Sequence, residues 1–307
     1  MFTFAMLFTV IGLSLFEVIS SIDNAIINAE VLGGMSAKAR RWFLFWGILF
    51  AVFVVRGTLP WLIVWAATPS LGLLGSLTAT FSNDPSVHAA IESSSPILLM
   101  GGGVFLLFLF LHWLFLEPKT FGLPGEKFIL RQGVWFYAAV SIALTLIVWY
   151  AMAINPMLAF GAVVGSTAFF ITHGFKQNAE EAEKTLMHGQ NHMSDISKIL
   201  YLEVIDMTFS IDGVLGAFAF TMAVPLILLG NGIGAIVVRW ITVSNIERIK
   251  KYPLLKNAAM YSVLALGAIM LAHAFGAHVP EWLSPTITTF IIAFFVLRSF
   301  QTKPKTT

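Results

Sequence analysis

The stretch EVISSIDNA (residues 17–25) places two carboxylates inside an otherwise apolar run of sequence. A second stretch, DMTFSIDGV (residues 206–214), repeats the pattern without a gap: an acid, then Ser-Ile-Asp, then Asn or Gly. Downstream of these two stretches, GILFAVFVVR (residues 47–56) and GNGIGAIVVR (residues 230–239) share the same spacing from Gly to Arg. We therefore interpret the chain as two copies of one unit.

The composition is typical of a polytopic membrane protein. Of the 307 residues, 58% are hydrophobic and only 11% are charged, whereas a soluble domain has roughly 25% charged residues. Cysteine is absent, which excludes disulfides and thiolate metal sites and favours hard cations bound by oxygen. Hydropathy and turn residues predict an all-α fold with about nine transmembrane helices, at residues 3–32, 42–67, 96–116, 134–154, 157–173, 199–222, 226–245, 256–277 and 285–300.

The basic residues predict the orientation of these helices. Sixteen of the eighteen Lys and Arg residues lie in the segments that follow the first, third, fifth, seventh and ninth predicted helices. The positive-inside rule makes these segments cytoplasmic, so we expect a cell-membrane protein with its N-terminus outside and its C-terminus inside. The basic residues form no long run, which argues against a nucleic-acid partner and leaves lipid as the surrounding partner.

The positions of the two copies predict an inverted repeat. Helices one to three and six to eight form the copies, and their offset of five helices is odd, so the second copy runs in the opposite direction. Transporters with inverted repeats bind their substrate at the repeat interface near the midplane. Within a single transmembrane domain of residues 1–307, we expect repeat 1 at 3–116, linking helices at 134–173, a cytoplasmic loop at 174–198, repeat 2 at 199–277 and a final helix at 285–300. The oligomeric state stays open.

Four acids and two arginines lie well inside the predicted spans, away from the span ends: Glu17, Asp23, Asp206 and Asp212, and Arg56 and Arg239. A buried ionised carboxylate is costly in hydrocarbon, so such residues indicate function. We expect the arginines to be structural counter-ions of the acids. Two negative charges remain uncompensated, and either a divalent cation or protonation of two acids would balance them.

Neutral oxygen donors accompany the acids: Asn24, with Ser21, Ser210 and Asn28 as further candidates. Six residues separate the acids within each copy, which corresponds to about 9 Å along an ideal helix. The sequence therefore allows either two stacked acidic layers or one site where both helices unwind, near Ser20 and Gly213. Carboxylate, amide and carbonyl oxygens suit Mg²⁺, Ca²⁺ or Mn²⁺, and the choice among these three metals stays open.

The doubled acidic motif, the Gly-to-Arg helix after each copy and HAFGAHVPEW (residues 273–282) together resemble the TerC family of integral membrane proteins. That family belongs with the LysE-type exporters, and the resemblance covers both repeats of a divergent branch. It implies manganese efflux, and it implies a metal-binding role for Glu17, Asp23, Asp206 and Asp212, with Asn24 beside them.

Our leading hypothesis is a transporter that exports a divalent cation, with manganese as the first candidate and no resident cofactor. The chain lacks a Walker motif, so we expect an ion gradient to drive it, with proton exchange through the same carboxylates as the simplest option. It also lacks the His-Glu-x-x-His and Gly-x-Ser-x-Gly motifs, so we do not expect an enzyme. The alternatives are an intramembrane metal-dependent enzyme or an accessory membrane protein of a stress response.

Overall fold

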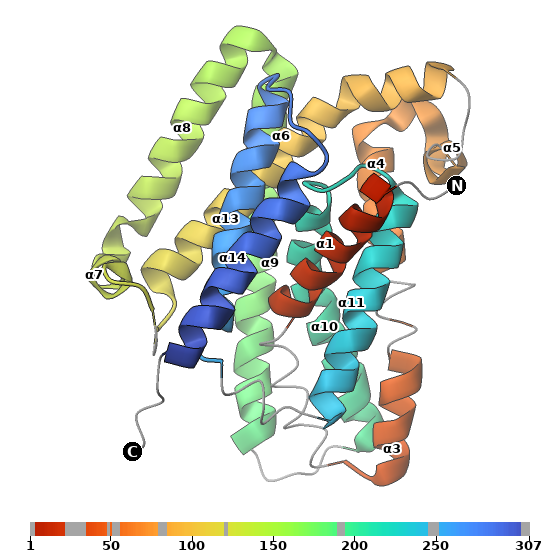
Figure 1. The fold of residues 1–307 in the computed structure, drawn as a ribbon, viewed down its shortest axis with the longest axis vertical. Coiled ribbons are helices and arrows are strands. Elements are labelled where there is room, and N and C mark those ends of the chain that lie inside the picture. The colour runs from red at the N-terminus through yellow and green to blue at the C-terminus, as the bar shows by residue number, and fades with distance from the viewer. Residues whose placement is uncertain are drawn as a thin grey trace.

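The computed structural model describes residues 4–21, 35–47, 50, 56–78, 85–119, 122–188, 194–244 and 252–301. Every regular element in these residues is helical, which confirms the predicted all-α fold (Figure 1). The main helices are α1 (Phe4–Ser20), α4 (Arg56–Ala67), α6 (Pro85–Leu116), α8 (Phe136–Ile154), α9 (Pro156–His188), α10 (Asp195–Ala217), α11 (Val224–Ser244), α13 (Leu255–Ala274) and α14 (Leu283–Gln301). Shorter helical segments are α3 (Ala37–Trp42), a π-helix (Phe43–Gly47), α5 (Gly72–Thr78), α7 (Glu126–Leu130) and the 3-10 helices Pro69–Leu71 and Gly133–Trp135.

The described helices are those of a multi-pass membrane protein. Five are long and apolar enough to cross a bilayer: Glu92–Leu116, Gly133–Ile154, Pro156–Phe175, Leu255–Ala274 and Leu283–Gln301. The pair Gly57–Ala66 and Pro69–Ser76, bent by 103°, would make a sixth span if the two helices cross as one unit. Nine spans and an inverted repeat stay predictions.

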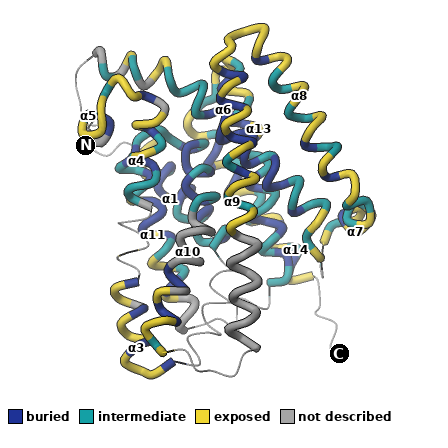
Figure 2. Tube along the Cα trace, turned by 180° about the vertical axis from the view of Figure 1, so that it is seen from behind, coloured by how far each residue is buried: buried dark blue, intermediate teal, exposed yellow. Residues whose placement is uncertain are grey.

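Helix α8 lies at the edge of the bundle and turns a large apolar surface outward (Figure 2). Its exposed side chains include Ile142, Leu146 and Trp149, the last of which is 76% exposed. A soluble protein seldom leaves so many large apolar side chains in water. This surface is suited to contact with lipid.

The predicted break between the fourth and fifth helices is confirmed. Asn155 adopts an extended backbone conformation between α8 and α9, and its Oδ1 accepts a hydrogen bond of 2.9 Å from the Met157 N–H. This bond caps the first turn of α9. Pro156 follows as the first residue of α9, where its missing N–H costs nothing.

Several helix boundaries differ from the prediction, among them those of α6, α9 and α1. Helix α6 begins at Pro85, eleven residues before the predicted start, because Pro96 and the serines before it lie inside a helix instead of at its beginning. Helix α9 continues through residues 174–188 of the predicted cytoplasmic loop, where Ala, Glu and Lys have high helix propensity. Helix α1 ends at Ser20, and the first predicted helix beyond Ser21 lies outside the described residues.

The core is formed where α6 packs against α9 and α13, which lie beside it in the middle of the molecule (Figure 1). Its largest fully buried side chains include Phe105, Phe108 and Trp113 of α6 and Phe169 of α9. The glycines of α9 allow a close helix approach, as the sequence predicts. A Cβ on Gly161 would lie 2.7 Å from the Ile97 carbonyl oxygen, and a Cβ on Gly165 would overlap the Gly101 backbone.

The second glycine-rich segment brings α11 against α1. A Cβ on Gly230 would lie 2.5 Å from Leu13 Cβ, and one on Gly234 would lie 2.6 Å from Glu17 Cβ. The Ser14 hydroxyl also donates a 3.0 Å hydrogen bond to the Gly230 carbonyl. The predicted close packing at this motif is confirmed, and the surface it packs on carries the first acid of the sequence motif.

Candidate functional site

Glu17 lies in the last turn of α1, at the junction of α1, α10 and α11. Its side chain is almost fully buried, with 1% exposure. Gly234 of α11 contacts its Cβ and Cγ, and a Cβ placed on Gly213 of α10 would lie 3.0 Å from Glu17 Oε2. The two glycines therefore leave the room that the Glu17 carboxylate occupies, and any larger residue at either position would press on it.

The serines after Glu17 bind to it directly. Ser21 donates a 2.7 Å hydrogen bond from its hydroxyl to Glu17 Oε1. Ser20 donates a hydrogen bond of 3.2 Å to the Glu17 carbonyl oxygen at the end of the helix. The Ser21 hydroxyl holds Glu17 Oε1, while Oε2 faces α10. Ser21, a predicted neutral donor, thus lies within the first acidic site.

Asp212 belongs to the second sequence copy and lies next to Gly213 on α10. Because a Cβ on Gly213 would lie 3.0 Å from Glu17 Oε2, the part of α10 that carries Asp212 packs on α1 beside Glu17. Asp212 is half-buried there. Helix α10 is continuous from Asp195 to Ala217, so its backbone does not unwind at Gly213. The hypothesis of one site at which both acid-bearing helices unwind therefore does not hold for α10.

Several predicted site residues cannot be placed as side chains. Asp206, Ser210 and Arg56 lie on described helices, but their side chains lie outside what the structure describes. Asp23, Asn24 and Asn28 lie outside the described residues altogether. Among the residues that are described, no group of three or more His, Asp or Glu side chains is arranged to hold a metal ion. Glu17 and Asp212 therefore represent the described part of the predicted acidic site.

Arg239 forms a buried ion pair with Glu203, an acid that lies outside both sequence motifs. Arg239 Nη2 lies 3.9 Å from Glu203 Oε1, and both side chains are about nine-tenths buried. The guanidinium also covers the Phe43 ring, with Cζ 4.1 Å from the ring centre. A Cβ on Gly47 would overlap Glu203 Oε1 and lie 3.2 Å from Arg239 Nη2. The predicted counter-ion thus has an acidic partner that the motif comparison missed.

A sequence signal for Glu203 does exist. It lies three residues before Asp206 in the sequence, a spacing at which two positions of a helix share one side.

Asn231 is the other residue that the sequence reasoning missed. It lies in residues 230–234, whose three glycines indicate close helix packing and draw attention away from the amide. Its side chain is fully buried, and within the part of the chain that the structure describes neither amide atom has a hydrogen-bond partner. The sequence did contain a signal for Asn231, because a polar amide in the middle of an apolar helix indicates a functional residue.

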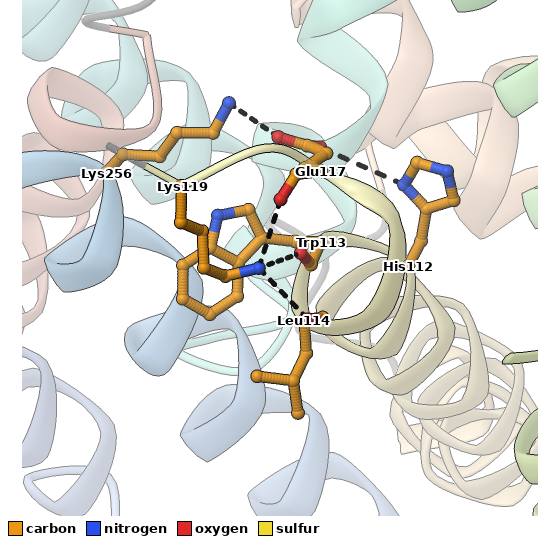
Figure 3. A network of polar contacts seen from close by, with 6 residues as sticks. All are labelled: His112, Trp113, Leu114, Glu117, Lys119 and Lys256. Carbon is orange, nitrogen blue, oxygen red and sulfur yellow. Dashed lines mark hydrogen bonds and ion pairs between the residues drawn. The ribbon is translucent and has the colours of Figure 1, made fainter. Parts of the chain in front are cut away.

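A separate polar cluster joins the end of α6 to the start of α13 (Figure 3). Lys119 Nζ donates hydrogen bonds to the carbonyls of Trp113 and Leu114, at 2.6 and 3.0 Å, and so caps the C-terminus of α6. Lys256 of α13 lies 2.6 Å from Glu117 Oε2. Burial raises the pKa of the Glu117 carboxyl, but His112 and Lys256 outweigh this effect and lower that pKa to about 2.

A buried carboxylate continues this cluster. Glu126 accepts hydrogen bonds of 3.0 Å from the Asn257 amide and from the Tyr261 hydroxyl. These bonds satisfy both oxygens, so Glu126 fastens the segment after α6 to α13. We interpret the whole cluster as structural, because its acids already have protein partners.

The chain belongs to a family described as "Protein of unknown function (DUF475)", whose family model matches residues 22–305. The match includes the second acidic motif, both Gly-to-Arg segments and all of the first motif after Ser21. No curated protein and no solved structure matches the chain. The family description assigns no activity, so the functional argument depends on the site itself.

Proposed function

We propose that this protein is a secondary transporter that exports a divalent cation, with manganese as the first candidate. The observation that carries the proposal is the position of Glu17. Its carboxylate is buried among apolar helices and faces the segment of α10 that carries the second sequence copy. Retaining such a group in a membrane protein is costly unless an ion, a proton or a counter-charge balances it.

The charge balance supports a cation. Glu203 lies 3.9 Å from Arg239 and takes up part of the positive charge that the sequence interpretation had assigned to the other acids. The sequence count of four acids and two arginines did not include Glu203, so the acids of this region exceed its arginines by more than the two charges counted there. Two carboxylates neutralise one divalent cation, and an oxygen-rich set with hydroxyl and amide donors suits Mn²⁺, Mg²⁺ or Ca²⁺.

The proposed architecture follows the sequence prediction. Nine spans form two inverted copies, the N-terminus lies outside the cell membrane, and the C-terminus is cytoplasmic. The cation site lies where the copies meet, formed by Glu17, Asp212 and the two remaining motif acids, Asp23 and Asp206. Alternating access then exposes this site to one side at a time, and protons exchanged through the carboxylates supply the coupling.

The test compares the metal content of cells that express wild type, Glu17→Gln or Asp212→Asn at equal protein levels. Mass spectrometry would measure Mn, Mg, Ca, Zn and Fe. Glu281→Gln is the matched control, because Glu281 is an exposed acid in the turn before α14. We expect wild type and the control to lower cellular manganese, and the two site variants to lose this effect. Equal metal contents in all four strains would refute the proposal.

A further inference from the structure

Asn231 combines complete burial with unused hydrogen-bonding capacity. It has 0% exposure, and neither Nδ2 nor Oδ1 has a hydrogen-bond partner in the described structure. Burying a primary amide without a hydrogen bond is unfavourable. A residue that serves only to fill space would be expected to be apolar, so the amide itself requires an explanation.

The residues around Asn231 place it beside the acidic site. Gly230 accepts a hydrogen bond from Ser14, and Gly234, one turn further along α11, contacts Glu17. On a helix with about 100° per residue, Asn231 lies about 60° around the axis from Gly234 and about 80° from Arg239. Arg239 reaches Glu203 on α10, so Asn231 projects between the side of α11 that meets α1 and the side that reaches α10.

The sequence repeat argues against a packing role for the amide. When the two Gly-to-Arg segments are aligned, Asn231 corresponds to Ile48 in the first copy. The same position in the same unit therefore accepts an apolar side chain of similar size. The amide is not needed to form the unit, and it distinguishes the second copy from the first.

We infer that Asn231 is a neutral oxygen ligand of the transported cation, with Oδ1 completing the set begun by Glu17 and Asp212. This inference rests on the proposed function. Amide oxygens bind Mn²⁺, Mg²⁺ and Ca²⁺ without adding charge, which lets two carboxylates neutralise the cation and still release it.

The test measures Mn²⁺ binding to purified protein by titration calorimetry, for wild type, Asn231→Leu and Asn231→Asp. Asn231→Leu is nearly isosteric, so we expect it to weaken Mn²⁺ binding at least tenfold. Without metal, its thermal midpoint should equal or exceed that of wild type, because it removes an unpartnered amide. Asn231→Asp keeps the oxygen and adds a charge, so it should bind Mn²⁺ at least as tightly as wild type.

Each other outcome overturns the inference in a recognisable way. Wild-type Mn²⁺ affinity in Asn231→Leu would remove Asn231 from the site and leave the proposed function standing. A lower thermal midpoint or loss of folding in the metal-free Asn231→Leu protein would show that the amide is structural. If wild type binds none of Mn²⁺, Mg²⁺ and Ca²⁺, the proposed function and this inference both fail.

Discussion

Replacing Gly234 with Ala should disturb the site without replacing any charged residue. The new Cβ would lie 2.6 Å from Glu17 Cβ, 2.7 Å from Glu17 Cγ and 2.8 Å from the Ser14 carbonyl oxygen. These atoms belong to the α1 backbone or lie next to it, so a side-chain rotation cannot relieve the overlap. Such overpacking costs about 1–3 kcal/mol, while Gly→Ala inside a helix gains about 1 kcal/mol. We expect a net loss of up to about 2 kcal/mol and a displaced Glu17 carboxylate.

Gly174→Ala is the matched control for this variant. Gly174 also lies within a helix, but a Cβ there would meet no atom within 4 Å. The control should therefore keep only the helix-propensity gain of up to about 1 kcal/mol.

Intrinsic fluorescence of the nine tryptophans would follow thermal unfolding of both variants in detergent. Gly234→Ala should unfold up to about 5 °C below wild type and bind Mn²⁺ more weakly, while Gly174→Ala should match or exceed wild type in stability. Identical behaviour of the two variants would refute the packing of α1 on α11 and the position of Glu17 that depends on it.

Three further predictions follow from the other contacts. Glu117 has its pKa lowered from 4.5 to about 2, so its contribution to stability is complete above pH 4.5 and is lost as the pH falls toward 2. Glu117→Gln should therefore lower the free energy of unfolding by about 1–2 kcal/mol at pH 7, after allowance for solvent screening, and by nothing near pH 2; an equal loss at both pH values would contradict the prediction. Removing one partner of the buried pair, as in Glu203→Gln, should cost about 3–5 kcal/mol because Arg239 would lose its acidic partner, and a chemical-unfolding curve unchanged from wild type would reject that pairing. The cysteine-free chain allows single cysteines to be tested with a membrane-impermeant thiol reagent in intact cells: Glu281→Cys should react from outside and Arg131→Cys should not, and the reverse pattern would reject the proposed orientation.

Local features of the fold could be read from the sequence because they depend on neighbouring residues. The break at Asn155 follows from an amide that caps a helix and a proline that begins one. The close approaches at Gly161 and Gly230 follow from the absence of side chains at helical spacing. The start of α6 was predicted too late, because Pro96 is as compatible with a helix interior in a membrane as with a helix start.

The acids of the site could be predicted from the sequence, whereas the residues that pair with the charged groups could not. A carboxylate in an apolar run is visible without a structure, which is how Glu17 and Asp212 were identified. Which arginine meets which acid depends on how α10 and α11 are rotated about their axes, and periodicity does not fix that rotation. The ion pair of Arg239 with Glu203 and the burial of Asn231 therefore depend on tertiary packing, which the sequence pattern does not determine.

The central claim is that Glu17 belongs to a transport site for a divalent cation. Its most direct test is Mn²⁺ flux into liposomes that contain purified wild type, Glu17→Gln or the control Glu281→Gln, with and without an imposed pH gradient. The account predicts flux by wild type and control that responds to the gradient, and at least a tenfold loss in Glu17→Gln with its fold retained. Equal flux through Glu17→Gln and wild type, or no flux through any of them, would contradict it.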